Sequence, residues 1–158
     1  MSKIGIIIEI KENKIKETNY GAITAANRRD SHEIYALLIG AGPDVNRDKL
    51  KKYGVGKAID IKFQDSKFGL KPGLKAKAVA AAVKHYHLDA VLGLGSSRGK
   101  DLLARIAATM NMPLVQDCMD VNIYEKTVTK SYFAGKIMAT LQLRGDFLLC
   151  TIRPNAIE

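Results

Sequence analysis

Long apolar runs and clusters of cysteine are both absent from this sequence of 158 residues. No apolar run approaches the roughly 20 residues that a membrane-spanning helix needs, so we expect no membrane insertion. The first apolar run is interrupted by Glu9 and Lys11 and is therefore too short for a signal peptide. The carboxylate of Glu9 is also atypical of a transit peptide. The two cysteines, Cys118 and Cys150, lack metal-binding spacing, and we expect reduced thiols in the cytoplasm.

Histidine and aromatic residues are also scarce. His85 and His87 lie near the end of an amphipathic helical pattern, where surface imidazoles are common, and no metal site is predicted. Aromatic residues make up 6% and are not interleaved with the lysines as a nucleic-acid stacking platform requires. The net charge of +9 is spread along the chain, and is densest in residues 11–16 and 49–52. An excess of basic residues can bind nucleic acid, an anionic surface or an acidic protein. The scattered positions of these basic residues favour a solvent-exposed basic face over nucleic-acid binding.

The first two-thirds of the chain alternate between strand and helix patterns. Residues 3–10 are nearly uniformly apolar, as expected for a strand covered on both faces. The predicted strands cover residues 3–10, 33–39, 57–62 and 89–94. The predicted helices run from Thr18, a candidate cap, to about Arg29, and over residues 44–53, 72–86 and 102–110. Repeated β–α units predict an α/β fold with a doubly wound, mainly parallel, Rossmann-like sheet.

The last third of the chain carries strand patterns only. Short β patterns cover residues 114–115, 119–124, 127–133, 137–143 and 147–152. Tight turns join them, and Arg144-Gly145-Asp146 is the clearest hairpin turn. These patterns predict an antiparallel strand extension at the C-terminal end of the sheet, within one domain that covers residues 1–158.

The glycine-rich loop at residues 93–99 follows a predicted strand, at the place where doubly wound sheets bind ligands. Three residues, not two, separate its last glycines, so it misses the dinucleotide fingerprint. It also misses the phosphate loop, since Asp101 stands where Ser or Thr would hold magnesium. The favoured interpretation is a capped helix start whose glycines allow close packing. The alternative is a nucleotide-binding turn that resembles the one in universal stress proteins, with contacts from Gly95, Ser96, Ser97, Gly99 and Lys100.

No set of residues combines a nucleophile, a base and an oxyanion hole, so no catalytic residue is predicted. Asp117 and Asp120 have no histidine near them in the sequence and are interpreted as loop and turn residues. Cys118 and Cys150 lie in apolar strand patterns, which is typical of small core residues. The sequence therefore predicts a protein that is not an enzyme.

Four segments carry a family resemblance. The first two are GKDLLARIAA at residues 99–108 and PLVQDCMDV at residues 113–121. The other two are YFAGKIMAT at residues 132–140 and TIRPNA at residues 151–156. In this order and at these distances they resemble the N-terminal domain of the electron transfer flavoprotein alpha subunit. The resemblance covers essentially the whole chain and implies an adenine nucleotide hydrolase-like fold.

The resemblance also implies a function. The expected role is that of a scaffold in a flavin-based electron carrier between dehydrogenases and an electron-transport acceptor. In this family FAD lies mainly on a second, C-terminal domain, so we expect no cofactor in this chain and FAD in the complete alpha–beta complex. The expected partners are the beta subunit and a C-terminal FAD-binding domain, in a cytoplasmic heterodimer of a bacterium or archaeon.

The antiparallel tail is the expected subunit interface. Short strands outside a parallel sheet offer an exposed edge or an apolar face that usually needs covering. The expected interface residues are Tyr132, Phe133, Ala134, Gly135, Arg153 and Pro154.

Overall fold

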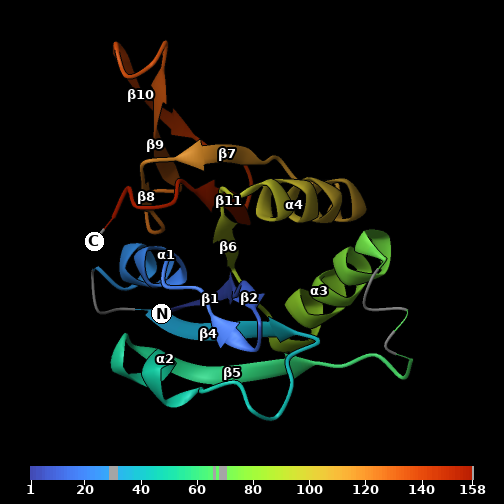
Figure 1. Ribbon diagram of the computed structural model, residues 1–158. Helices are drawn as coiled ribbons and strands as arrows, with labels where there is room; N and C mark the ends of the chain where they lie inside the picture. The colour runs from blue at the N-terminus through green and yellow to red at the C-terminus, as the bar shows by residue number, and fades with distance from the viewer. Residues whose placement is uncertain (29–31, 66, 68–70, 158) are drawn as a thin grey trace.

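A six-stranded parallel sheet forms the centre of the structure (Figure 1). The structure is a computed structural model that describes residues 1–28, 32–65, 67 and 71–157. The strands lie in the order β5-β4-β1-β6-β11-β7, and all neighbouring pairs are parallel. Their bounds are β1 Ser2–Ile7, β4 His32–Ile39, β5 Val55–Ile61, β6 Ala90–Leu94, β7 Val115–Cys118 and β11 Leu148–Ile152. The chain adds strands to one side of β1 and then to the other, so the predicted doubly wound sheet is confirmed.

The helices of the described chain bury the apolar side chains of this sheet. They are α1 Asn19–Asn27, α2 Asp48–Lys52, α3 Pro72–Tyr86 and α4 Ser97–Met110. Along β1, Ile4 and Ile6 join the core cluster that includes α1, whereas Ile7 joins the cluster that includes α3 and α4. Successive side chains of a strand point to opposite faces, which explains why this strand is apolar throughout. None of the described helices is long and apolar enough to cross a membrane.

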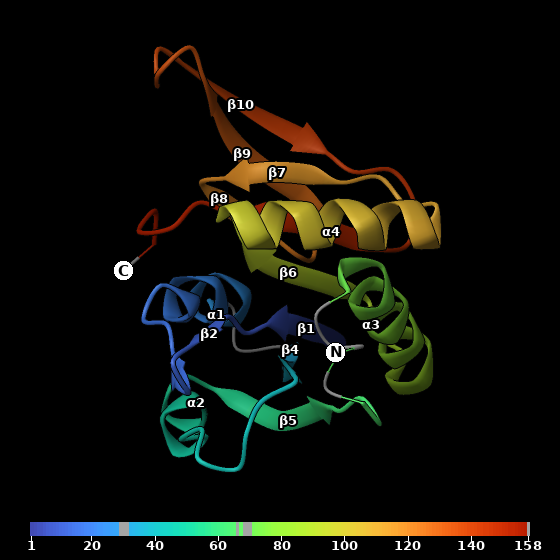
Figure 2. The same ribbon diagram turned by 45° about the vertical axis from the view of Figure 1, so that its right-hand side comes forward.

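The predicted antiparallel extension is a separate three-stranded sheet with the order β10-β9-β8. Its strands are β8 Asp120–Asn122, β9 Thr127–Tyr132 and β10 Ile137–Gln142. Val121 and Val128 are buried in the main core, and Leu141, the cross-strand partner of Val128, packs against it. Beyond these anchors, the β9–β10 hairpin projects from the body of the protein in both views (Figures 1 and 2).

The predicted hairpin turn at Arg144-Gly145-Asp146 is wrong. The strand that follows it, β11, does not pair with β10 but lies in the central sheet, parallel to β6 and β7. The physical reason is that every residue from Phe147 to Ile152 is buried, as in a central parallel strand covered on both faces. The tight hairpin turn of this region lies instead at residues 133–136, between β9 and β10.

Two predictions near the N-terminus also need correction. The first strand ends at Ile7 rather than residue 10, and β2 Ile10–Lys11 then pairs with β3 Lys14–Ile15. Glu12 and Asn13, with φ of 50° and 58°, form the turn of this hairpin. Thr18 makes no side-chain capping hydrogen bond, because its backbone is already helical and not in the extended conformation of a capping residue. The predicted helix end at Arg29 lies outside the described residues.

Candidate functional site

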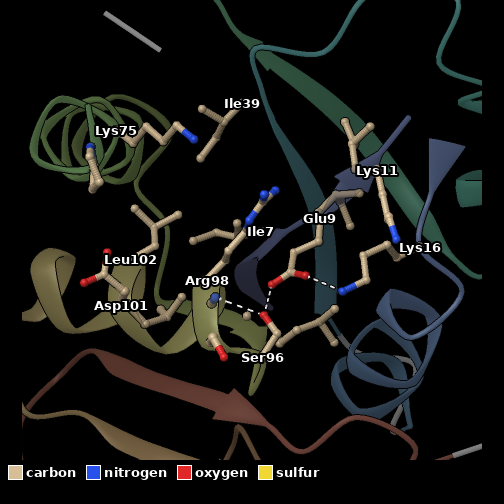
Figure 3. A pocket seen from close by; sticks show the side chains of 18 residues that line it. Ile7, Glu9, Lys11, Lys16, Ile39, Lys75, Ser96, Arg98, Asp101 and Leu102 are labelled. Carbon is tan, nitrogen blue, oxygen red and sulfur yellow. Dashed lines mark hydrogen bonds and ion pairs between the residues drawn. The ribbon is translucent and has the colours of Figure 1, made fainter. Parts of the chain in front are cut away.

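A cavity of about 700 Å³ lies beyond the carboxyl ends of β1 and β6, where the strand order reverses. Doubly wound sheets bind their ligands at this position. Residues at the end of β1, the start of α4 and the facing side of α3 line the cavity (Figure 3). Of the five residues predicted for a nucleotide-binding turn, Ser96, Ser97 and Gly99 line it.

The other two predicted residues of that turn have partners away from the cavity. The Gly95 amide donates a hydrogen bond of 2.7 Å to the carbonyl of Ile152 in β11. The Lys100 ammonium lies 3.8 Å from a carboxylate oxygen of Asp117 in β7. The structure therefore joins Gly95 and Lys100 to the central sheet.

The Glu9 carboxylate occupies the space beside the N-terminus of α4. The Ser96 hydroxyl accepts a hydrogen bond of 3.0 Å from the Gly99 amide and donates one to Oε1 of Glu9 (Figure 3). The other oxygen of Glu9 pairs with the Lys16 ammonium at 2.8 Å. An anion beside a helix N-terminus is stabilised by the unpaired amides and the helix dipole. Glu9 supplies that anion from within the chain, and a phosphate at the same place would meet a like charge.

Asn19 holds Glu9 in this position. Its side chain is fully buried, and its Oδ1 accepts a hydrogen bond of 2.9 Å from the Glu9 amide. Its Nδ2 donates to the carbonyls of Glu9 at 2.8 Å and Lys16 at 2.7 Å. The sequence analysis did not single out Asn19. The sequence feature that could have identified Asn19 is its position as a polar residue beside the apolar positions Tyr20 and Ile23 of the predicted helix.

The glycines of the loop permit close packing between α4 and β6, as the favoured interpretation expects. A Cβ atom on Gly99 would lie 1.8 Å from the carbonyl oxygen of Leu94, and one on Gly93 would lie 2.6 Å from Cδ2 of Leu103. Neither approach is sterically allowed. The glycine pattern is therefore accounted for by the contact between helix and strand.

The acidic residues and cysteines considered in the sequence have structural contacts. No group of three His, Cys, Asp or Glu side chains among the described residues lies close enough to hold a metal ion. Asp117 and Asp120 lie in β7 and β8, so their interpretation as loop and turn residues is wrong. Their carboxylates pair with different arginines, Arg153 at 2.7 Å and Arg28 at 2.8 Å. Cys118 and Cys150 are free and fully buried, and their mutual hydrogen bond and burial raise the pKa of the Cys150 thiol. Both side chains lie in the core, so the core interpretation of both cysteines is confirmed, and the raised pKa disfavours the reactive thiolate at Cys150.

The β9–β10 hairpin carries the most concentrated apolar surface of the described chain. Four of the eight exposed large apolar side chains lie within the seven residues from Tyr132 to Met138. Phe133 at the turn is 74% exposed, and Ile137 and Met138 are 51% and 55% exposed. An apolar surface that projects from the fold is typical of an interaction site.

Arg153, a predicted interface residue, joins the central sheet to β9 at Ser131, two residues before the hairpin turn. Its guanidinium donates to one oxygen of Asp117 at 2.7 Å and 3.2 Å, and to the hydroxyl of Ser131 in β9 at 3.1 Å. These hydrogen bonds, with the nearby charge of Lys100, hold the pKa of Asp117 below its usual value. Pro154, which follows, is only partly buried. Arg153 thus has a structural role, whatever else its exposed part contacts.

Replacing Asp117 with asparagine is expected to lower stability at neutral pH and to have less effect in acid. The lowered pKa means that Asp117 stabilises the fold above its unfolded pKa of about 3.9 and that this stabilisation is lost as the pH falls through the folded pKa. We expect Asp117→Asn to cost about 1 kcal/mol at pH 7 and little near pH 3, measured by urea unfolding. Asn tolerates the φ of 63° at this position, so the backbone is not strained.

The control for this experiment is Asp101→Asn. The Asp101 carboxylate forms an exposed ion pair with Arg105 one helical turn away, which contributes little to stability. A cost for Asp117→Asn that stays constant from pH 7 to pH 3 would show that the carboxylate charge is not the cause.

Comparisons with known proteins match nearly the whole sequence to one family. The family model of the electron transfer flavoprotein domain matches residues 4–158. The electron transfer flavoprotein alpha subunit of Syntrophomonas wolfei is 24% identical over 161 residues, which cover 100% of this chain and 50% of that protein. The alpha subunits of Bacillus subtilis and Mycobacterium tuberculosis are 24% and 29% identical, over 99% and 100% of this chain and 49% of each relative. The chain therefore spans about half the length of these curated relatives, which agrees with an N-terminal domain.

Proposed function

Because the chain belongs to the electron transfer flavoprotein domain family, we propose that it is the N-terminal scaffold and subunit-docking domain of an alpha subunit. The complete protein is a cytoplasmic electron carrier that takes electrons from dehydrogenases and passes them to an electron-transport acceptor. This domain has no catalytic role of its own. Its contribution is to hold a flavin-carrying domain and a beta subunit at a fixed separation, since the protein supplies the orientation of a redox cofactor.

The single observation that carries the docking role is the exposed apolar tip of the β9–β10 hairpin. Tyr132 and Ile137 face each other across the strands, and Phe133 extends from the turn. Stable interfaces depend on a few well-buried aromatic or apolar anchors, and such side chains rarely gather in one place on a monomer. The beta subunit is the proposed occupant of this surface.

FAD belongs to the complete complex in this proposal and not to this chain. The cavity beside α4 does not fit a dinucleotide, because the Glu9 carboxylate lies at the amides that would bind the pyrophosphate. The spacing of the 93–99 loop departs from the dinucleotide fingerprint as well. The same carboxylate is the reason why the alternative of a free-standing nucleotide-binding domain is not proposed.

Replacing Phe133 with aspartate is expected to weaken the complex with the beta subunit by about 30-fold or more. A hot-spot anchor contributes about 2 kcal/mol or more to binding, and a carboxylate cannot replace it in an apolar recess. The melting temperature of the uncomplexed protein should not change, because Phe133 is mostly exposed. Titration calorimetry of the separated partners measures the affinity. The complex purified after co-expression with the beta subunit gives the flavin content.

The matched control is Tyr124→Asp. Tyr124 is 82% exposed and lies in the turn between β8 and β9, at the other end of the same small sheet. Its replacement should leave the affinity within about twofold, since surface positions outside an interface contribute little. Gly135 is a less suitable test site, because its φ of 85° would strain any substituted residue. Wild-type affinity in the Phe133→Asp variant would remove the docking role from this hairpin.

A further inference from the structure

We propose that the partner surface which receives the β9–β10 hairpin is acidic around an apolar recess. This inference rests on the proposed docking role and specifies the chemistry of the partner. The hairpin combines an apolar stripe with positive charges and carries no carboxylate of its own. The two properties lie in the same short segment, so one partner surface has to match both.

The charge of the hairpin has one sign. Between Glu125 and Asp146 the sequence holds Lys126, Lys130, Lys136 and Arg144, and no aspartate or glutamate. Lys126, at the base, lies 3.7 Å from a carboxylate oxygen of Asp146. Lys130 and Lys136, on the projecting part, form no ion pair within 4 Å of any described carboxylate. Lys130 is close enough to Asp117 to help lower the pKa of that carboxyl, but Asp117 is already paired with Arg153. The projecting hairpin therefore has a positive local potential.

The apolar stripe begins in the core and continues outward along one face of the hairpin. Val128 is buried and faces Leu141, and four residues further along the same face Tyr132 faces Ile137. Side chains two residues apart on a strand share a face, so the exposed pair extends the buried one. Lys130 lies between them, with its ammonium 5.4 Å from the centre of the Tyr132 ring.

The turn places a second charge beside the tip. Phe133, Ala134 and Gly135 all have positive φ, of 51°, 53° and 85°, and the Lys136 amide donates to the Phe133 carbonyl at 3.2 Å. This compact turn brings the backbone of Lys136 to that of the exposed Phe133. Apolar anchors with charges at their edge are the usual composition of a protein interface, in which edge charges guide association and exclude unsuitable partners.

A protein surface fits these features better than a polyanion does. Nucleic-acid binding gains its affinity from many phosphate contacts, and the projecting hairpin offers only two unpaired lysines. An anionic membrane likewise attracts clusters of four or more basic residues. The opposite face of the hairpin carries the exposed Met138 beside the short polar side chains Thr129, Ser131 and Thr140, a mixture that suits the edge of a protein interface.

The test compares charge reversal with loss of the apolar anchor in the natural protein that contains this chain. The Kd for the beta subunit is measured at about 50 mM and about 500 mM salt, where screening is weak and strong respectively. The double variant Lys130→Glu/Lys136→Glu is expected to raise the Kd about tenfold or more at low salt, and less than about threefold at high salt. The wild-type Kd itself should rise with salt.

A control variant has the same change in net charge at a distance from the hairpin. Lys77 and Lys84 are exposed on α3, which lies away from the hairpin in both views, and neither has an ion pair among the described residues (Figures 1 and 2). Lys77→Glu/Lys84→Glu is expected to change the low-salt Kd by less than about twofold. An equal effect of both double variants would mean that only net charge matters, and would overturn the inference.

The remaining outcomes separate this inference from the docking role. A double variant at Lys130 and Lys136 that binds as tightly as wild type, while Phe133→Asp is weakened, overturns the acidic partner surface and leaves the docking role intact. Wild-type binding by both variants overturns the docking role and this inference together. Tighter binding of the wild type to phosphatidylserine vesicles or to duplex DNA than to the beta subunit, lost on charge reversal, would assign the lysines to lipid or nucleic acid.

Discussion

Replacing Gly99 with alanine is expected to lower the free energy of unfolding by about 3 kcal/mol or more. The added methyl group would lie 1.8 Å from the carbonyl oxygen of Leu94, and 3.2 Å from the Glu9 carboxylate. The first of these neighbours is backbone in the middle of the sheet and cannot turn aside as a flexible side chain can. The N-terminus of α4 would have to move off β6 instead, which breaks the hydrogen bond between Ser96 and Glu9.

The comparison variant is Gly73→Ala, in the first turn of α3. A Cβ atom at Gly73 meets nothing within 4 Å, and alanine is the better helix former. Urea unfolding should therefore show unchanged or slightly raised stability for Gly73→Ala and a large loss for Gly99→Ala. Equal stability of the two variants would mean that α4 and β6 can move apart to fit the methyl group with no loss of unfolding free energy. That result would contradict the close packing described above.

The sequence predicted the alternation of strands and helices well because each signal is local. A strand covered on both faces is uniformly apolar, and residues 3–10 and 89–94 have that pattern. The same rule would have placed residues 147–152 in the central sheet, since they are equally apolar. The turn residues before them suggested a hairpin instead. Strand pairing depends on partners far away in the sequence, and a turn motif does not specify them.

The candidate site was less predictable for a similar reason. Ser96 and Gly99 were identified because a glycine-rich turn after a strand is a recognisable local pattern. Glu9 lies 87 residues before Ser96, and no spacing rule joins the two. The consequence is that a turn resembling a nucleotide site in the sequence has a carboxylate of the same chain beside its amides in the structure.

Replacing Asn19 with alanine is expected to cost about 3 kcal/mol, because three hydrogen bonds are lost in a buried place. The Glu9 amide would lose its partner, and the carbonyls of Glu9 and Lys16 would each lose one of their two hydrogen bonds. Asn27→Ala is the control, since Asn27 ends the same helix and makes no side-chain hydrogen bond among the described residues. The Asn27→Ala variant should have an unfolding free energy less than about 1 kcal/mol below that of the wild type.

Asn19→Asp then separates hydrogen bonding from packing at this position. Aspartate has almost the same shape as asparagine, so a packing role for Asn19 predicts a milder effect than that of alanine. A hydrogen-bonding role predicts the opposite, because the carboxylate keeps the acceptor for the Glu9 amide but turns a charge toward the carbonyls of Glu9 and Lys16. We expect Asn19→Asp to be at least as unstable as Asn19→Ala at pH 7, by urea unfolding. Near-wild-type stability of Asn19→Asp would mean that Asn19 does not position Glu9 through these donors, and the anion beside α4 would then need another explanation.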